Sequence, residues 1–182
     1  MISEQFLNVF KEATERKWSF DQLRKDVYGF QFRAGTYWNE GLSEEKLRKY
    51  ENAVGFDFPA DVRLFLRQMN GTSPETINVY GNSGEPPRTS VGVYSFPRDL
   101  QQVRGRITDV EENRTEVMQQ LRSEGLDATE PVRFLPFYMH RYVLCMSDPG
   151  KSIVASVVVR DVDAILFASS LQQYLEKEFL QE

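Results

Sequence analysis

One stretch of the chain carries the start and stop signals of two consecutive helices, and it limits the fold more than any other. Ser43 can cap the first helix, and the two acidic residues that follow it favour the positive end of the helix dipole. Gly55 can end that helix in a left-handed conformation. Pro59 can open the second helix, because the missing proline N–H has no helical partner there. We therefore predict a helical hairpin that stops at Asn70 and Gly71.

Hydrophobic periodicity and turn residues predict the remaining elements. Further helices are expected at about 3–17, at about 98–124 with a break at Gly105 and a capping box at Thr108, and at the C-terminal end after Ser169 or Ser170. Strands are expected at 76–80, 91–95, 132–138, 141–146 and 153–159, whereas 164–167 is ambiguous. The aromatic segment 18–41 is expected to be a packed loop or short strands, 81–88 an exposed loop, and 148–150 a turn. Helices, strands, a helix, strands and a helix in this order predict an α+β fold with a single domain over residues 1–182.

The composition excludes several classes of protein. With 22 basic and 27 acidic residues the net charge is −5, which argues against direct nucleic-acid binding. A single cysteine cannot form an intramolecular disulfide, which favours a reducing compartment. The chain shows neither an apolar run long enough to span a membrane nor a secretory signal, so we expect a cytoplasmic protein.

The residues that could carry chemistry are few. His140 and Cys145 are the only histidine and cysteine, whereas a structural zinc site normally needs four such ligands. Their odd separation would place them on opposite faces of one strand, which argues against a nucleophile pair. Gly150 and Lys151 resemble the end of a phosphate-binding loop, but Cys145 occupies the position of the first glycine of that motif. We therefore predict no catalytic residue, no metal and no cofactor.

A first candidate for surface recognition is the polar and aromatic triplet His140, Arg141 and Tyr142. Tyrosine and arginine are frequent at the centres of protein interfaces, so this triplet could face a partner. Alternatively, it could be the end of a strand in which Tyr142 is buried and His140 bonds to the backbone.

A second candidate is the predicted loop with Glu85 and Arg88, together with Tyr80 and Tyr94 on the strands beside it. These tyrosines could contact a partner, but aromatic residues on strands more often belong to the core.

The chain resembles the SUKH superfamily, which contains fungal cell-wall-assembly and killer-toxin-resistance regulators and many bacterial immunity proteins. Residues of the helical hairpin carry the first part of the resemblance: Leu47, Tyr50, Glu51, Gly55, Phe58, Pro59, Asp61, Phe65, Leu66, Asn70 and Gly71. The C-terminal half carries the second part: Leu135, Pro136, Phe137, Tyr138, His140, Arg141, Tyr142, Val157–Val159, Asp163, Ala164, Ile165, Leu171, Tyr174, Leu175, Glu178 and Phe179. The resemblance covers about 42–180 and leaves 1–41 as an N-terminal extension.

The resemblance implies a mixed, mainly antiparallel sheet with flanking helices and a non-enzymatic protein-binding function. A bacterial relative of this kind would neutralise a toxin domain, such as a nuclease, by direct binding. The alternative is a regulatory scaffold that has no link to toxins. A third hypothesis is a small-molecule or enzymatic site centred on His140, and it requires a cavity beside that residue.

Overall fold

A four-stranded antiparallel sheet forms the centre of the computed structural model, which describes residues 2–20, 23–24, 26, 29–73, 76–79, 88–128, 131–146 and 152–181. Its strands follow in chain order: β6 (Arg133–Tyr138), β7 (Arg141–Cys145), β8 (Ile153–Val158) and β9 (Asp163–Ala168). Two smaller antiparallel sheets lie beside it. One pairs β2 (Tyr37–Glu40) with β3 (Met69–Ser73), and the other has the order β1 (Gly29–Gln31), β4 (Thr76–Val79) and β5 (Arg88–Ser90).

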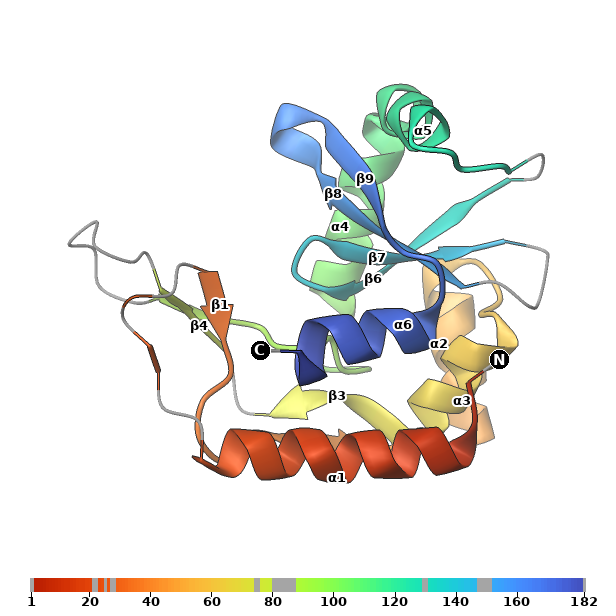
Figure 1. Cartoon of the computed structure of the whole chain (residues 1–182). Coiled ribbons are helices and arrows are strands. Elements are labelled where there is room, and N and C mark those ends of the chain that lie inside the picture. Colours follow the sequence, from red (N-terminus) through yellow and green to blue (C-terminus); the bar gives the residue numbers. More distant parts are fainter. Residues whose placement is uncertain are drawn as a thin grey trace.

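Both faces of the central sheet are packed, because alternate side chains of each strand enter different clusters. In β7, Tyr142 and Leu144 join the cluster covered by α4 (Leu100–Glu112) and α5 (Arg114–Ser123). Val143 and Cys145 join the larger cluster on the other face. There the sheet is covered by α6 (Leu171–Leu175), which continues into the π-helical turn η3 (Glu176–Leu180). Figure 1 shows α5 above β9 and α6 between the sheet and α1 (Glu4–Phe20).

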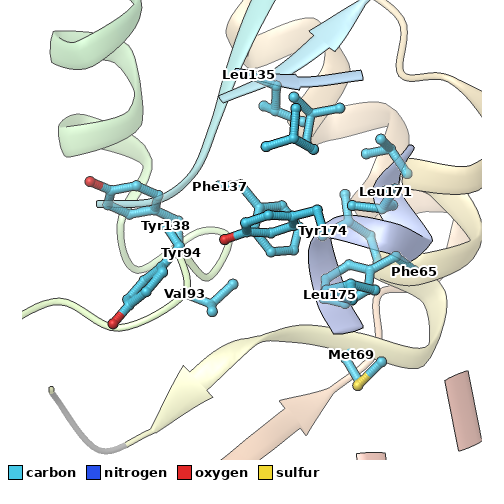
Figure 2. Packing of buried hydrophobic residues seen from close by; sticks show 14 of the residues in the cluster. Phe65, Met69, Val93, Tyr94, Leu135, Phe137, Tyr138, Leu171, Tyr174 and Leu175 are labelled. Carbon is cyan, nitrogen blue, oxygen red and sulfur yellow. The ribbon is translucent and has the colours of Figure 1, made fainter. Parts of the chain in front are cut away.

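Tyr174 lies at the centre of the larger cluster, between α6 and the sheet (Figure 2). Its ring meets the ring of Phe137 edge-on, with 5.5 Å between the ring centroids. Leu171, Leu175 and Phe179 of the same helical segment are also buried, as the spacing of these residues predicts. The mixed α+β architecture inferred from the sequence is confirmed. No helix in the described ranges is long and apolar enough to cross a bilayer.

The helical hairpin is formed by α2 (Glu44–Val54) and α3 (Ala60–Gln68), as predicted. The Ser43 hydroxyl accepts a hydrogen bond from the Lys46 N–H, and Gly55 adopts a φ of 85° at the end of α2. The prediction that α3 stops at Asn70 and Gly71 is wrong. The helix ends at Gln68, and the next residues form β3, which the sequence did not predict.

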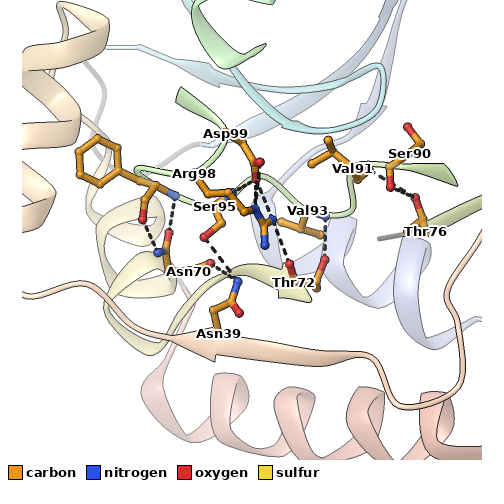
Figure 3. Close-up of polar contacts among 11 residues, drawn as sticks. Asn39, Asn70, Thr72, Thr76, Ser90, Val91, Val93, Ser95, Arg98 and Asp99 are labelled. Atoms are coloured by element: carbon orange, nitrogen blue, oxygen red, sulfur yellow. Dashed lines mark hydrogen bonds and ion pairs between the residues drawn. The ribbon is translucent and has the colours of Figure 1, made fainter. Parts of the chain in front are cut away.

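Asn70 binds a segment distant in sequence instead of ending a helix (Figure 3). Its side-chain amide donates to the Phe96 carbonyl at 2.7 Å, and its side-chain oxygen accepts from the Phe96 N–H at 2.9 Å. Gly71 has a φ of 70°, and a Cβ there would lie 2.5 Å from the carbonyl oxygens of Val93 and Tyr94. The Asn-Gly pair therefore holds the irregular segment 91–99 against β3.

Replacing Asn70 with aspartate tests this contact. A carboxylate can still accept from the Phe96 N–H but cannot donate to the Phe96 carbonyl, which would lose its partner in a mostly buried position. We expect Asn70→Asp to lower the free energy of unfolding by about 1–3 kcal/mol in urea titrations. Asn52→Asp, on the exposed face of α2, is the matched control and should change it by less than about 0.5 kcal/mol. Equal effects of the two substitutions would contradict the assignment.

Two further predictions are corrected. The strand expected at 91–95 lies earlier in the chain, as β5. Segment 91–95 itself is irregular, because its backbone hydrogen bonds are divided between two elements. The Val93 carbonyl accepts from the Thr72 N–H, whereas the Tyr94 N–H donates to the Phe137 carbonyl. The long helical stretch breaks at Asn113 and not at Gly105. Residues 81–87 and the turn at 148–150 lie outside the described residues.

Thr108 does not form the predicted capping box. It lies inside α4, and its hydroxyl donates to the Arg104 carbonyl one turn earlier. Val103 and Val110 are both fully packed on the same helix, so burial on either side of Gly105 keeps the helix continuous across that glycine.

The N-terminal segment completes the larger cluster. Helix α1 begins after Ser3, whose hydroxyl accepts from the Phe6 N–H, and it extends to Phe20, three residues beyond the predicted end. Trp18 stacks on Phe32 with 4.5 Å between ring centroids. Phe32 in turn stacks on Tyr138 of β6. Trp18, Phe32 and Trp38 therefore share one core with the C-terminal half.

Candidate functional site

The turn between β6 and β7 places His140 at one end of the central sheet. Met139 adopts a φ of 51°, and the His140 carbonyl accepts from the Val157 N–H of β8 at 2.8 Å, which ties the turn to the sheet. The imidazole is half-buried. Burial, followed by the positive charges of Arg141 and Arg106, lowers the pKa of His140 from 6.5 to about 4, and Asp163 opposes this shift. His140 is therefore neutral at pH 7.

The lowered pKa of His140 has a consequence for stability in acid. Between pH 6.5 and about 4 the unfolded chain binds a proton that the folded chain excludes, so this group lowers the unfolding free energy as the pH falls through that window. We expect the native protein to lose more stability between about pH 7 and about pH 4.5 than His140→Gln, which has no titrating group there. Urea titrations of both proteins at the two pH values measure the difference. Equal acid sensitivity would contradict a buried neutral imidazole.

Arg141 is held from three sides next to His140. Its Nε donates to the Glu178 carboxylate of η3 at 2.9 Å, and its Nη1 donates to the Ser156 hydroxyl of β8 at 2.9 Å. The guanidinium also lies over the ring of Phe167, 3.7 Å from the ring centroid. The side chains of Arg141 and Glu178 are only 14% and 18% exposed, so water screens this ion pair weakly. Arg141 thus joins β7, β8, β9 and η3 in one fixed arrangement.

A cavity of about 330 Å³ opens beside these residues, and we call it the His140 cleft. Its lining comes from β1, the β6–β7 turn and η3: Gly29, Phe30, Tyr138, Met139, His140, Arg141 and Glu178. These elements meet because the core aromatic residues of the N-terminal segment pack against β6 and η3. The cleft has apolar walls, one neutral imidazole and the ion pair of Arg141 with Glu178. Such a surface is suited to binding a side chain or a small ligand. The cavity that a site centred on His140 requires is therefore present.

The structure separates the other residues of the predicted surfaces. Tyr142 is 1% exposed and points into the α4–α5 side of the sheet, where its ring meets Phe134. Tyr94 is 7% exposed and lies next to Arg106. Arg88 is exposed on β5. Of the predicted residues that the structure describes, the His140 cleft contains only His140 and Arg141.

Two of the predicted residues, Tyr80 and Glu85, lie outside the described residues. They stay predictions.

Sequence reasoning did not find the remaining walls of the cleft. The sequence could have indicated Glu178, because this residue follows Tyr174 by one helical turn and therefore lies beside the sheet. No sequence pattern indicates Phe30, since it belongs to a three-residue strand whose partner is β4.

A second hollow of about 420 Å³ lies at the opposite end of the β6–β7 hairpin. It is lined by the α2–α3 turn and the strand ends: Asp57, Phe58, Pro59, Ala60, Pro131, Arg133, Cys145 and Met146. Burial raises the pKa of the Cys145 thiol well above its ordinary value, so this sulfur is protonated and unreactive at pH 7. His140 lies in the turn before β7 and not on the strand with Cys145, so the two do not form a nucleophile pair. We therefore place the candidate site at the His140 cleft.

A comparison with protein families matches residues 41–177 to the SMI1 / KNR4 family (SUKH-1). The match covers most of the chain, from three residues before α2 into the first residues of η3. The chain belongs to the SUKH-1 family. No curated protein matches it. Members of the SUKH family are generally non-catalytic.

The limits of the SUKH-1 match divide the cleft into two parts. The β6–β7 turn lies inside the matched region, whereas Gly29 and Phe30 precede it and Glu178 follows it. The matched region therefore supplies the β6–β7 side of the cleft, and the N-terminal segment supplies Gly29 and Phe30.

Proposed function

We propose that this SUKH-1 protein acts by binding another protein, and that its partner is a toxin domain, for example a nuclease, which it neutralises as an immunity protein. The observation that carries the proposal is the His140 cleft, a preformed hollow with an exposed apolar wall. Members of the SUKH family include immunity proteins and regulators, so binding to a partner is the common activity.

Exposed apolar side chains also occur on η3 and α1, besides Phe30 in the cleft. Phe30 is 36% exposed in the cleft wall, and Leu180 is 37% exposed two residues beyond Glu178. Lys17 of α1 donates to the backbone carbonyls of Phe179 and Gln181, which brings this helix next to η3. Phe20, at the end of α1, is 81% exposed. Exposed apolar patches are typical of protein interfaces, and we propose that these side chains contribute to one.

The charge of the chain fits a basic partner. A net charge of −5 attracts a positively charged toxin domain and raises the association rate at low salt. The same attraction weakens as the salt concentration increases, so the association rate is expected to fall while the dissociation rate changes little.

Where a toxin domain is encoded beside its gene, co-expression with that domain tests the proposal. We expect the native protein to restore growth and to form a complex with that domain in purified form. Tyr37→Ala, which removes an exposed aromatic ring on β2 outside the cleft, should protect as the native protein does. Absence of both protection and complex formation would contradict the proposal. Stable binding to proteins of the same cell without any protection would favour the regulatory scaffold instead.

A further inference from the structure

The size of the His140 cleft limits what it can hold. A volume of about 330 Å³ is at the lower end of the range of small-molecule sites, and it accommodates one large amino-acid side chain. Protein interfaces commonly bury a few such side chains in pockets and surround them with weaker contacts.

The walls of the cleft favour an aromatic occupant. Phe30 is the exposed aromatic residue of the lining, at 36%. Tyr138, which stacks on Phe32, and Met139, whose sulfur accepts from the Ser90 hydroxyl, also line the cleft but are only 3% and 6% exposed. An aromatic ring stacked on Phe30 gains contacts that an aliphatic side chain does not.

The charges of the cleft favour an uncharged occupant. The Arg141 Nε lies 2.9 Å from the Glu178 carboxylate, and the Ser156 hydroxyl accepts a hydrogen bond from Nη1 of the same guanidinium. The opposite charges of Arg141 and Glu178 cancel, so a cationic or anionic side chain would lose its hydration in a cleft without net charge. The neutral imidazole of His140 offers one N–H donor and one acceptor nitrogen, which matches a hydroxyl group that both donates and accepts.

We propose that the His140 cleft receives a tyrosine side chain of the partner protein, with its ring against Phe30 and its hydroxyl at His140. This inference rests on the proposed protein-binding function and names the chemistry that the cleft recognises. Phe30 lies before the matched SUKH-1 region, so this wall of the cleft comes from the N-terminal segment of the chain.

Nuclear magnetic resonance titrations with blocked amino acids test the inference without a known partner. The probes are N-acetyl-tyrosinamide, N-acetyl-leucinamide and N-acetyl-argininamide, added to the full-length ¹⁵N-labelled protein. We expect the tyrosine probe to shift the amide signals of Gly29, Phe30, His140 and Glu178 in a saturable way. Its dissociation constant should be at least about fivefold lower than those of the other two probes, a difference of about 1 kcal/mol.

Two variants assign the binding to the cleft. Phe30→Ala removes the exposed wall and should weaken the tyrosine probe by at least about tenfold, a ring–ring and burial loss of about 1.4 kcal/mol. Tyr37→Ala removes an aromatic ring that is 53% exposed on β2, and it should leave the dissociation constant unchanged. Unchanged spectra outside the substituted strand show that each variant keeps the fold.

Three results would overturn the inference: no saturable shift at the cleft, tighter binding of the arginine or leucine probe, or unchanged binding by a folded Phe30→Ala. Each of these leaves the protein-binding function standing if the toxin domain still binds. Conversely, a tyrosine-selective cleft in a protein that protects against no toxin would contradict the immunity function while the inference about the cleft holds.

Discussion

Phe179→Ala is expected to lower the free energy of unfolding by about 3–5 kcal/mol, the range for deleting a fully packed phenylalanine. Phe179 is 2% exposed on η3, and its ring meets Phe10 of α1, Trp38 of β2 and Tyr138 of β6 at centroid distances of 5.9, 5.7 and 5.8 Å. Alanine would leave a cavity that these rings, which come from separate elements, cannot close.

Urea titrations of Phe179→Ala and Phe20→Ala measure this contribution. Phe20 is 81% exposed at the end of α1, so its removal should change the unfolding free energy by less than about 0.5 kcal/mol. The pair compares the same chemical deletion in the core and on the surface. A loss below about 1 kcal/mol in Phe179→Ala would contradict the packing of α1, β2 and η3 in one core.

Glu51→Ala is expected to have an effect of similar size for a different reason. The Glu51 carboxylate is buried, accepts from the Phe58 N–H at 2.9 Å and pairs with the Arg63 guanidinium. Alanine would leave the Phe58 N–H without this acceptor and Arg63 with Glu44 as its remaining partner. Breaking a buried ion pair from one side costs about 3–5 kcal/mol, and the remaining Glu44 contact places the expected loss toward the lower value.

Glu45→Ala is the matched control for Glu51→Ala. Glu45 lies on the same helix and pairs with Lys49 at 2.6 Å, but both side chains are largely exposed. Exposed pairs of this kind contribute about 0.3–0.5 kcal/mol and weaken in salt. If thermal unfolding showed equal losses for the two substitutions, the hairpin turn would not depend on the buried carboxylate.

The elements set by local interactions are the ones that the sequence predicted well. Ser43 begins α2 and Gly55 ends it through bonds to residues three or four positions away, so nearby residues suffice to predict both helix ends. The alternating and apolar runs of β6, β7 and β8 likewise predict the central sheet. The α+β architecture follows from the order of these elements.

The errors arise where distant residues decide the conformation. Asn70 looks like a helix stop in the sequence, but its amide is bound to Phe96, 26 residues later. Segment 91–95 has the composition of a strand, yet its backbone bonds are divided between Thr72 and Phe137. Gly105 looks like a break, but buried valines on both sides hold the helix through it.

The candidate site was predicted in part for the same reason. His140 and Arg141 are adjacent in the sequence and form a recognisable polar pair before a strand. The opposing walls come from Phe30 and Glu178, which are more than a hundred residues and more than thirty residues away, respectively. The fold brings them together through the aromatic core, which no local pattern reveals.

The central claim is that the SUKH-1 motifs hold the fold while the His140 cleft binds the partner. Calorimetric titration of the toxin domain against a Phe30→Ala/His140→Ala double variant, the native protein and Tyr37→Ala tests it most directly. We predict that the double variant keeps its fold and binds at least about a hundredfold more weakly, a loss of about 2.7 kcal/mol typical of an interface hot spot, while Tyr37→Ala binds as the native protein does. Native affinity in the folded double variant would contradict the claim.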